Sequence, residues 1–171
     1  MTGLVFVDTN VVLYAVDTSD GTKHRSAREW MDKLWRDRTG RTSVQVLSEF
    51  YVNATRLLSR GLSKQQAWEH VLALSEWAPQ PIDFQILELG QQVQARHRLS
   101  WWDSLIVAAA YAQGCGILLT EDLQHDADYA GVTAVNPFIA RVQDAAGRYA
   151  PALPLPPMRG RGRPKKAAST A

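Results

Sequence analysis

The stretch LVFVDTNVVLYAV, residues 4–16, joins an apolar strand to an apolar helix through one acid, Asp8. Further apolar strands are expected at residues 117–120 and 133–135, with helical segments between them. Strands that alternate with helices indicate an α/β fold around a small parallel sheet. Ligands of such sheets bind beyond the carboxyl ends of the strands, where Asp8 stands. Asp is equally favoured as the cap of a following helix, so position alone leaves both roles open.

Composition places the chain among globular proteins. Its 171 residues, 46% hydrophobic and with six Trp, are enough for one domain with a sizeable core. No apolar run reaches the roughly 18 residues that suggest a membrane span. The N-terminus lacks the basic and small-residue features of a signal peptide, and the single Cys115 cannot form an internal disulfide. These features predict a cytoplasmic protein without a membrane partner.

The charge changes sign near the C-terminus. The net charge is +2, but residues 158–171 contain no acid and five basic residues: Arg159, Arg161, Arg163, Lys165 and Lys166. The rest of the chain keeps 14 basic against 17 acidic residues, a net charge of −3. We therefore expect a globular domain over residues 1–149, followed by a Pro-rich linker and a basic, disordered tail over residues 150–171.

The tail sequence RGRP, residues 161–164, is similar to an AT-hook, which lies in the minor groove of A·T-rich DNA. An extended Arg-Gly-Arg segment fits a narrow groove of enhanced negative potential. The alternative is a solvated basic tail that contacts the phosphates of any polyanion, RNA included.

Two more acids stand at marked places in predicted helices. Glu49 lies at the edge of the apolar stripe of residues 43–53, where a solvated surface acid is the alternative. Asp103 opens SWWDSLIVAAAYAQG, residues 100–114, which we expect to be a central, buried helix. Ser100 and Asp103 fit a capping box. A carboxylate on this turn also stands at the positive end of the helix dipole, which suits a fixed anion or a metal ligand.

A group of acids from distant parts of the chain suits one chemistry in particular. Phosphodiester hydrolysis needs an activated water and neutralised phosphate charge, which Mg²⁺ or Mn²⁺ on carboxylate oxygens supplies. The chain has no P-loop, G-x-G-x-x-G, G-x-S-x-G or H-E-x-x-H motif, and its four His show no zinc spacing. An aspartate-nucleophile phosphatase would have a second Asp at the position of Asn10.

Four stretches together resemble PIN-domain ribonucleases: those around Asp8, Glu49 and Asp103, and ILLTEDLQHDADYAGVTAVNPF at 117–138. In particular they resemble the VapC-type toxins of VapBC toxin–antitoxin pairs. The resemblance covers residues 4–138 and depends on the order of the four stretches, since each one alone is weak. It implies a three-layer α/β/α sandwich with a small parallel sheet, whose acids converge to bind Mg²⁺ or Mn²⁺.

The resemblance also implies roles for particular residues. It gives catalytic and metal-binding roles to four acids: Asp8, Glu49, Asp103 and Asp122. Three polar residues are implied to orient these carboxylates: Thr9, Asn10 and Thr120. The fourth acid follows a Thr-x pattern, which ranks Asp122 above Glu121 and Glu121 above Asp126.

The implied activity is metal-assisted hydrolysis of RNA by an activated water, leaving 5′-phosphate and 3′-hydroxyl ends. The implied partners are a VapB-like antitoxin and a second copy in a homodimer. Any exposed member of the set Trp30, Trp35, Trp68 and Trp77 would suit such surfaces, although we expect most of them in the core. Two alternatives stay open: a non-catalytic nucleic-acid-binding module that works through the tail, and a housekeeping PIN-type RNA-processing nuclease without an antitoxin.

Overall fold

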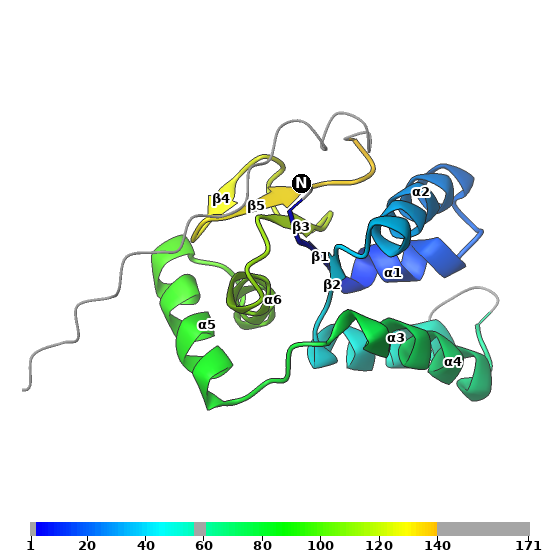
Figure 1. Cartoon of the computed structure of the whole chain (residues 1–171), viewed down its shortest axis with the longest axis horizontal. Coiled ribbons are helices and arrows are strands. Elements are labelled where there is room, and N and C mark those ends of the chain that lie inside the picture. Colours follow the sequence, from blue (N-terminus) through cyan, green and yellow to red (C-terminus); the bar gives the residue numbers. More distant parts are fainter. Residues whose placement is uncertain (1–2, 57–60, 140–171) are drawn as a thin grey trace, which may run out of the picture.

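The computed structural model describes residues 3–56 and 61–139 of the chain (Figure 1). Its strands are β1 (Val5–Val7), β2 (Gly40–Arg41), β3 (Ile117–Leu119), β4 (Asp128–Tyr129) and β5 (Val132–Val135). Its helices are α1 (Thr9–Val16), α2 (Gly21–Asp37), α3 (Val44–Arg56), α4 (Lys64–Leu74), the short 3₁₀ helix η1 (Ser75–Trp77), α5 (Phe84–His97) and α6 (Trp101–Ala112). The predicted linker and basic tail lie outside the described residues.

The five strands of the described residues form one sheet in the order β2-β1-β3-β5-β4. Neighbouring strands from β2 to β5 pair in parallel, whereas β4 pairs with β5 in the antiparallel sense. The expected parallel sheet is therefore a mixed one. Ala130 and Gly131 both have positive φ (59° and 88°), which matches the tight turn that folds β4 back onto β5.

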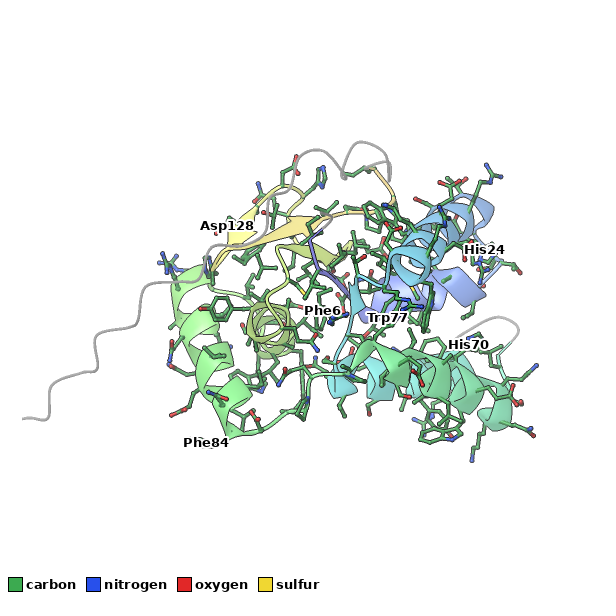
Figure 2. The ribbon with its side chains drawn as sticks, viewed as in Figure 1. Phe6, His24, His70, Trp77, Phe84 and Asp128 are labelled. Atoms are coloured by element: carbon green, nitrogen blue, oxygen red, sulfur yellow. The ribbon has the colours of Figure 1, made fainter. Side chains whose placement is uncertain are left out.

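Helices cover the sheet on two sides, as Figure 1 shows. One side carries α5 and α6, and the other carries α1 and α2, while α3 packs on α1 and α4 on α3 near the β2 end of the sheet. This arrangement is the predicted three-layer α/β/α sandwich. Figure 2 shows Phe6 of β1 in the middle of the molecule, where it is completely buried. No helix of the described residues is long and apolar enough to cross a membrane.

Helix α6 lies in the interior, as its composition predicted. Every residue from Ser104 to Ala110 is buried, so only its first turn and its end reach the surface. Ser104 is the one polar residue in this run, and its hydroxyl donates to the carbonyl of Ser100 (2.7 Å). The apolar faces of the helix pack on α5 and the sheet, and this packing fixes the position of Asp103 on the first turn.

The edge strand β2 is not among the strands that the sequence predicts. Gly40 is buried and pairs with Val5 of β1. A Cβ atom at this position would lie 2.5 Å from Cε2 and Cζ2 of Trp77. Trp77 is itself buried beside β2 (Figure 2), so this close packing requires glycine.

The Trp side chains divide between core and surface more evenly than expected. Trp30 and Trp77 are buried, whereas Trp35 and Trp68 are exposed. Trp102, on the first turn of α6, is also exposed (61%). The expectation that most of the four named Trp lie in the core is therefore right for two of them.

Replacing Gly40 by Ala should destabilise the protein, because Trp77 must move away from the new methyl group. We expect a loss of roughly 1–3 kcal/mol in the free energy of unfolding, measured by urea denaturation. Gly21→Ala is the matched control, since a Cβ there meets nothing within 4 Å. Equal stability of the two variants would contradict the proposed role of the Gly40–Trp77 contact.

Candidate active site

The candidate site lies where the order of the parallel strands reverses. Strand β1 has β2 on one side and β3 on the other, which makes its carboxyl end the switch point of the sheet. Val7 pairs with Leu119, and the backbone N–H of Asp8 donates to the carbonyl of Leu119 (3.0 Å). This register places Asp8 beside Thr120 at the carboxyl edge.

Asp8 is buried, with 7% of its surface exposed. Its Oδ1 accepts from the backbone N–H of Thr9 (2.7 Å), the contact by which Asp8 caps α1. Its Oδ2 accepts from the hydroxyl of Thr120 (2.7 Å) and the amide of Asn10 (3.2 Å). The structure therefore shows the capping role of Asp8, and it places the second carboxylate oxygen at the carboxyl edge of the sheet, where a ligand role was the alternative.

Burial raises the pKa of Asp8 to about 7, because the charged carboxylate loses hydration. The hydrogen bonds from Thr120 and Thr9 act in the opposite direction. The negative charges of Asp122 and Glu49 raise the pKa further, which places both acids within electrostatic range of Asp8.

Asn10 links Asp8 to the turn after β3. Its amide nitrogen also donates to Oδ2 of Asp122 (2.9 Å) and to the hydroxyl of Thr120 (3.2 Å). The backbone N–H of Asp122 donates to the same Thr120 hydroxyl (3.1 Å). Asp122 is exposed, so its carboxylate is accessible from solvent. The side-chain oxygen of Asn10, Oδ1, is buried and has no hydrogen-bond partner among the described residues.

Glu49 reaches the same region from α3. The hydroxyl of Thr9 donates to its Oε2 (3.0 Å), and the amide of Gln45 donates to its Oε1 (3.0 Å). The same Gln45 amide donates to the carbonyl of Trp102 (3.3 Å), which ties α3 to the first turn of α6. Gln45 is buried and was missed in the sequence, although its place four residues before Glu49 puts both on one helix face.

Asp103 is held by the cap of α6. Its Oδ2 accepts from the hydroxyl of Ser100 (2.6 Å), and its backbone N–H donates to that hydroxyl (3.1 Å). The carboxylate thus bonds the Ser100 side chain rather than the backbone amide expected of a capping box. Asp103 directly follows Trp102, whose backbone carbonyl accepts from the Gln45 amide. Because the same amide donates to Glu49, Trp102 and Gln45 connect the first turn of α6 to Glu49.

The remaining acids of 118–126 differ in their surroundings. Glu121 forms an ion pair with Lys23 of α2 (2.6 Å). Asp126 is exposed, at a turn position with positive φ (61°), and lies 3.4 Å from Nε2 of His125. The carboxylate of Asp122 is the one hydrogen-bonded to Asn10 and near Asp8.

The donor set fits a hard divalent cation. Carboxylate oxygens predominate, Asn10 adds an unbonded carbonyl oxygen, and a cation would offset the repulsion among Asp8, Glu49 and Asp122. In the described ranges no three Asp, Glu, His or Cys side chains are arranged as a complete metal site. Asp8, Glu49 and Asp122 are instead linked through Thr9 and Asn10. The side chain of Asp103 bonds Ser100, and the structure connects it to Glu49 only through the Trp102 backbone and Gln45.

A model of the PIN domain family matches residues 5–128, and the chain therefore belongs to the PIN domain family. This match includes all four predicted acids. No curated protein matches the chain.

Solved structures with the same fold are remote in sequence. A toxin–antitoxin complex from Klebsiella pneumoniae shares 20% identity with a TM-score of 0.57, over 78% of this chain and 97% of that one. VapC20 from Mycobacterium tuberculosis, a sarcin-ricin loop cleaving toxin, shares 19% identity with a TM-score of 0.52, over 69% of this chain and 89% of that one. VapBC2 from Rickettsia felis, bound to a DNA fragment from its promoter, shares 16% identity with a TM-score of 0.55, over 77% of this chain and 96% of that one. At these identities the similarity establishes the fold.

The buried carboxyl of Asp8 should make the metal-free protein less stable as the pH rises. Its pKa of about 7 in the folded state lies above the ordinary aspartate value of 3.8, so the folded state binds more protons between these limits. Relative to Asp8→Asn, which cannot ionise, we expect the wild type to lose on the order of 3 kcal/mol between pH 5 and pH 7.5. Urea denaturation in a chelating buffer measures this difference.

The matched control for this titration is Asp32→Asn, which removes an exposed carboxylate of α2. The difference in the free energy of unfolding between this variant and the wild type should change little over the same pH range. A pH-independent difference between the wild type and Asp8→Asn would show that the Asp8 carboxyl titrates normally.

Proposed function

We propose that this PIN-domain protein is a Mg²⁺- or Mn²⁺-dependent endoribonuclease and the toxin of a toxin–antitoxin pair, acting in the cytoplasm. The observation that carries the nuclease proposal is the buried Asp8 carboxylate at the switch point, with Glu49 and Asp122 in electrostatic range. The family match and the toxins of the same fold support the toxin role.

Four acids would hold the cation: Asp8, Glu49, Asp103 and Asp122. When bound, the cation would activate a water and neutralise charge on the scissile phosphate. Thr120 and the Thr9 N–H hold the Asp8 carboxylate in one orientation, and Asn10 aligns Asp122 with it.

Glu49 is the group we propose to orient the attacking water. Its two oxygens accept from Thr9 and Gln45 on opposite sides, which fixes the plane of the carboxylate. The remaining lone pairs are free to accept a proton from water, since a carboxylate has about four acceptor positions. Direct binding of the cation by Glu49 uses the same lone pairs.

The proposed partner is a small antitoxin similar to VapB, because the K. pneumoniae and R. felis structures are toxin–antitoxin assemblies. Exposed aromatic side chains such as Trp35, Trp68 and Trp102 are suited to partner surfaces. A homodimer is a second use of such surfaces. A housekeeping RNA-processing nuclease would share the chemistry and lack the antitoxin.

Asp8→Asn should abolish Mg²⁺-dependent RNA cleavage and growth inhibition while the protein stays folded. The neutral amide removes a negative ligand at the centre of the site, so we expect the cleavage rate to fall by roughly 100-fold or more. Cleavage of RNA by purified protein, with mapping of 5′-phosphate and 3′-hydroxyl ends, measures the effect. Cleavage at the wild-type rate by a folded Asp8→Asn variant would refute the nuclease proposal.

The turn after β3 offers an internal comparison. Asp122→Asn should reduce cleavage strongly, because its carboxylate is the one bonded to Asn10 beside Asp8. Asp126→Asn changes an exposed turn acid and should leave cleavage within about twofold of the wild type. A larger loss from Asp126→Asn would overturn the ranking of these acids.

For the basic tail we propose binding to A·T-rich duplex DNA through Arg161 and Arg163. A peptide of residues 158–171 should bind an A·T-rich duplex more tightly than a G·C-rich one at matched salt, measured by fluorescence anisotropy. Equal affinity would leave only phosphate contacts, which any polyanion satisfies. The same measurement with single-stranded RNA tests the alternative of a nucleic-acid-binding module that works through the tail.

A further inference from the structure

Lys23 of α2 is held by groups from three other parts of the chain. Its ammonium donates to Oε2 of Glu121 (2.6 Å) and to the hydroxyl of Tyr14 (3.0 Å). It also lies 4.5 Å from the ring centre of Tyr14 and 5.1 Å from that of Phe138. The Glu121 carboxylate, followed by the Tyr14 hydroxyl, raises the pKa of Lys23 above its usual range, so the ammonium stays charged at neutral pH.

The two aromatic rings are themselves fixed. Tyr14 and Phe138 meet edge to face with their ring centres 5.1 Å apart. The segment after β5 is bound to α2 by the hydroxyl of Ser26, which donates to the carbonyl of Pro137 (2.6 Å). The N–H of Phe138 donates to the side chain of Asn136 (2.9 Å). Lys23 therefore occupies a rigid position rather than a mobile one.

The turn after β3 contacts two different helices through its adjacent residues Glu121 and Asp122. The carboxylate of Glu121 goes to Lys23 on α2, whereas the carboxylate of Asp122 goes to Asn10 on α1 (2.9 Å). The Asp122 N–H is bonded to the Thr120 hydroxyl (3.1 Å). Since neighbouring side chains are held by different helices, the orientation of Asp122 depends on where Glu121 is held.

Charge leads to the same conclusion. Asp122 and Glu49 already act on Asp8, and an unpaired Glu121 would add another negative charge to the turn. Lys23 neutralises Glu121, and only 30% of the Lys23 side chain and 23% of the Glu121 side chain are exposed. Loss of either partner leaves a partly exposed charge without its ion-pair partner.

We propose that Lys23 is a positioning residue for Asp122: by holding Glu121 against α2, it fixes the turn that presents Asp122 to the cation. Glu121 is then a structural acid and not a ligand of that cation. This inference rests on the proposed metal-dependent nuclease.

The test compares Lys23→Met with Glu121→Gln in the full chain. Each should weaken Mn²⁺ binding, measured by titration without RNA, by roughly tenfold, the effect typical of groups that orient metal ligands. The Mg²⁺ concentration for half-maximal RNA cleavage should rise in parallel. Lys23→Arg keeps the charge and should stay within about twofold of the wild type.

A double variant sharpens this comparison. Lys23→Met combined with Glu121→Gln should weaken Mn²⁺ binding no more than either single change, because each one already breaks the pair. Lys33→Met is the matched control: it breaks an ion pair with Asp37 elsewhere on α2, of similar exposure. That control should leave Mn²⁺ affinity unchanged.

Three results would overturn the inference. Weaker Mn²⁺ binding in Glu121→Gln with unchanged binding in Lys23→Met would make Glu121 a metal ligand. Slower cleavage in Lys23→Met with unchanged Mn²⁺ affinity would assign Lys23 to RNA binding. Unchanged affinity in both variants would reduce the pair to a surface contact.

Two further measurements keep these outcomes distinct. Should Lys23→Met not fold, the charge swap of Lys23→Glu with Glu121→Lys decides the question by the same Mn²⁺ titration. The swapped ion pair should restore Mn²⁺ affinity to within a fewfold of the wild type, whereas affinity as low as that of Glu121→Gln would make Glu121 a metal ligand. A wild-type protein that neither binds Mn²⁺ nor cleaves RNA refutes the proposed function, whereas an active wild type with unaltered variants refutes only the role of Lys23.

Discussion

The hydrogen bond between Thr120 and Asp8 is the contact on which the candidate site depends. It joins the residues that follow β1 and β3, and the parallel register of these strands sets its 2.7 Å length. Because the carboxylate is buried, its charge destabilises the fold, and hydroxyl and amide donors offset only part of that cost. The sheet edge thus holds a group poorly suited to stability and well suited to a cation.

Sequence reasoning recovered what local pattern determines. The apolar run before Asp8 identified β1, and the composition of α6 identified a buried helix with Asp103 on its first turn. It missed β2, a strand of two residues whose Gly40 pairs with Val5 of β1 and packs against Trp77, both distant in the sequence. It also missed β4, a strand of two residues whose pairing depends on the turn at 130–131.

The parts of the site that were missed are long-range side-chain contacts. Lys23 and Glu121 are 98 residues apart, and neither position carries a motif that indicates the other. Gln45 had a local signal, its spacing from Glu49, but its contact with the Trp102 carbonyl depends on how α3 and α6 pack. The sequence could indicate the acids because their chemistry is specific, and their roles stay a prediction, whereas the residues that contact them are defined by geometry.

The short edge strands limit how this molecule can meet a partner. The sheet ends in β2 on one side and β4 on the other, and each has only two residues. An incoming chain would find few unpaired backbone groups there, so strand addition and edge-to-edge aggregation are both disfavoured. Among the described residues, the helix surfaces and the turns at the carboxyl edge are therefore better suited to contacts, and there side chains rather than backbone hydrogen bonds would determine specificity.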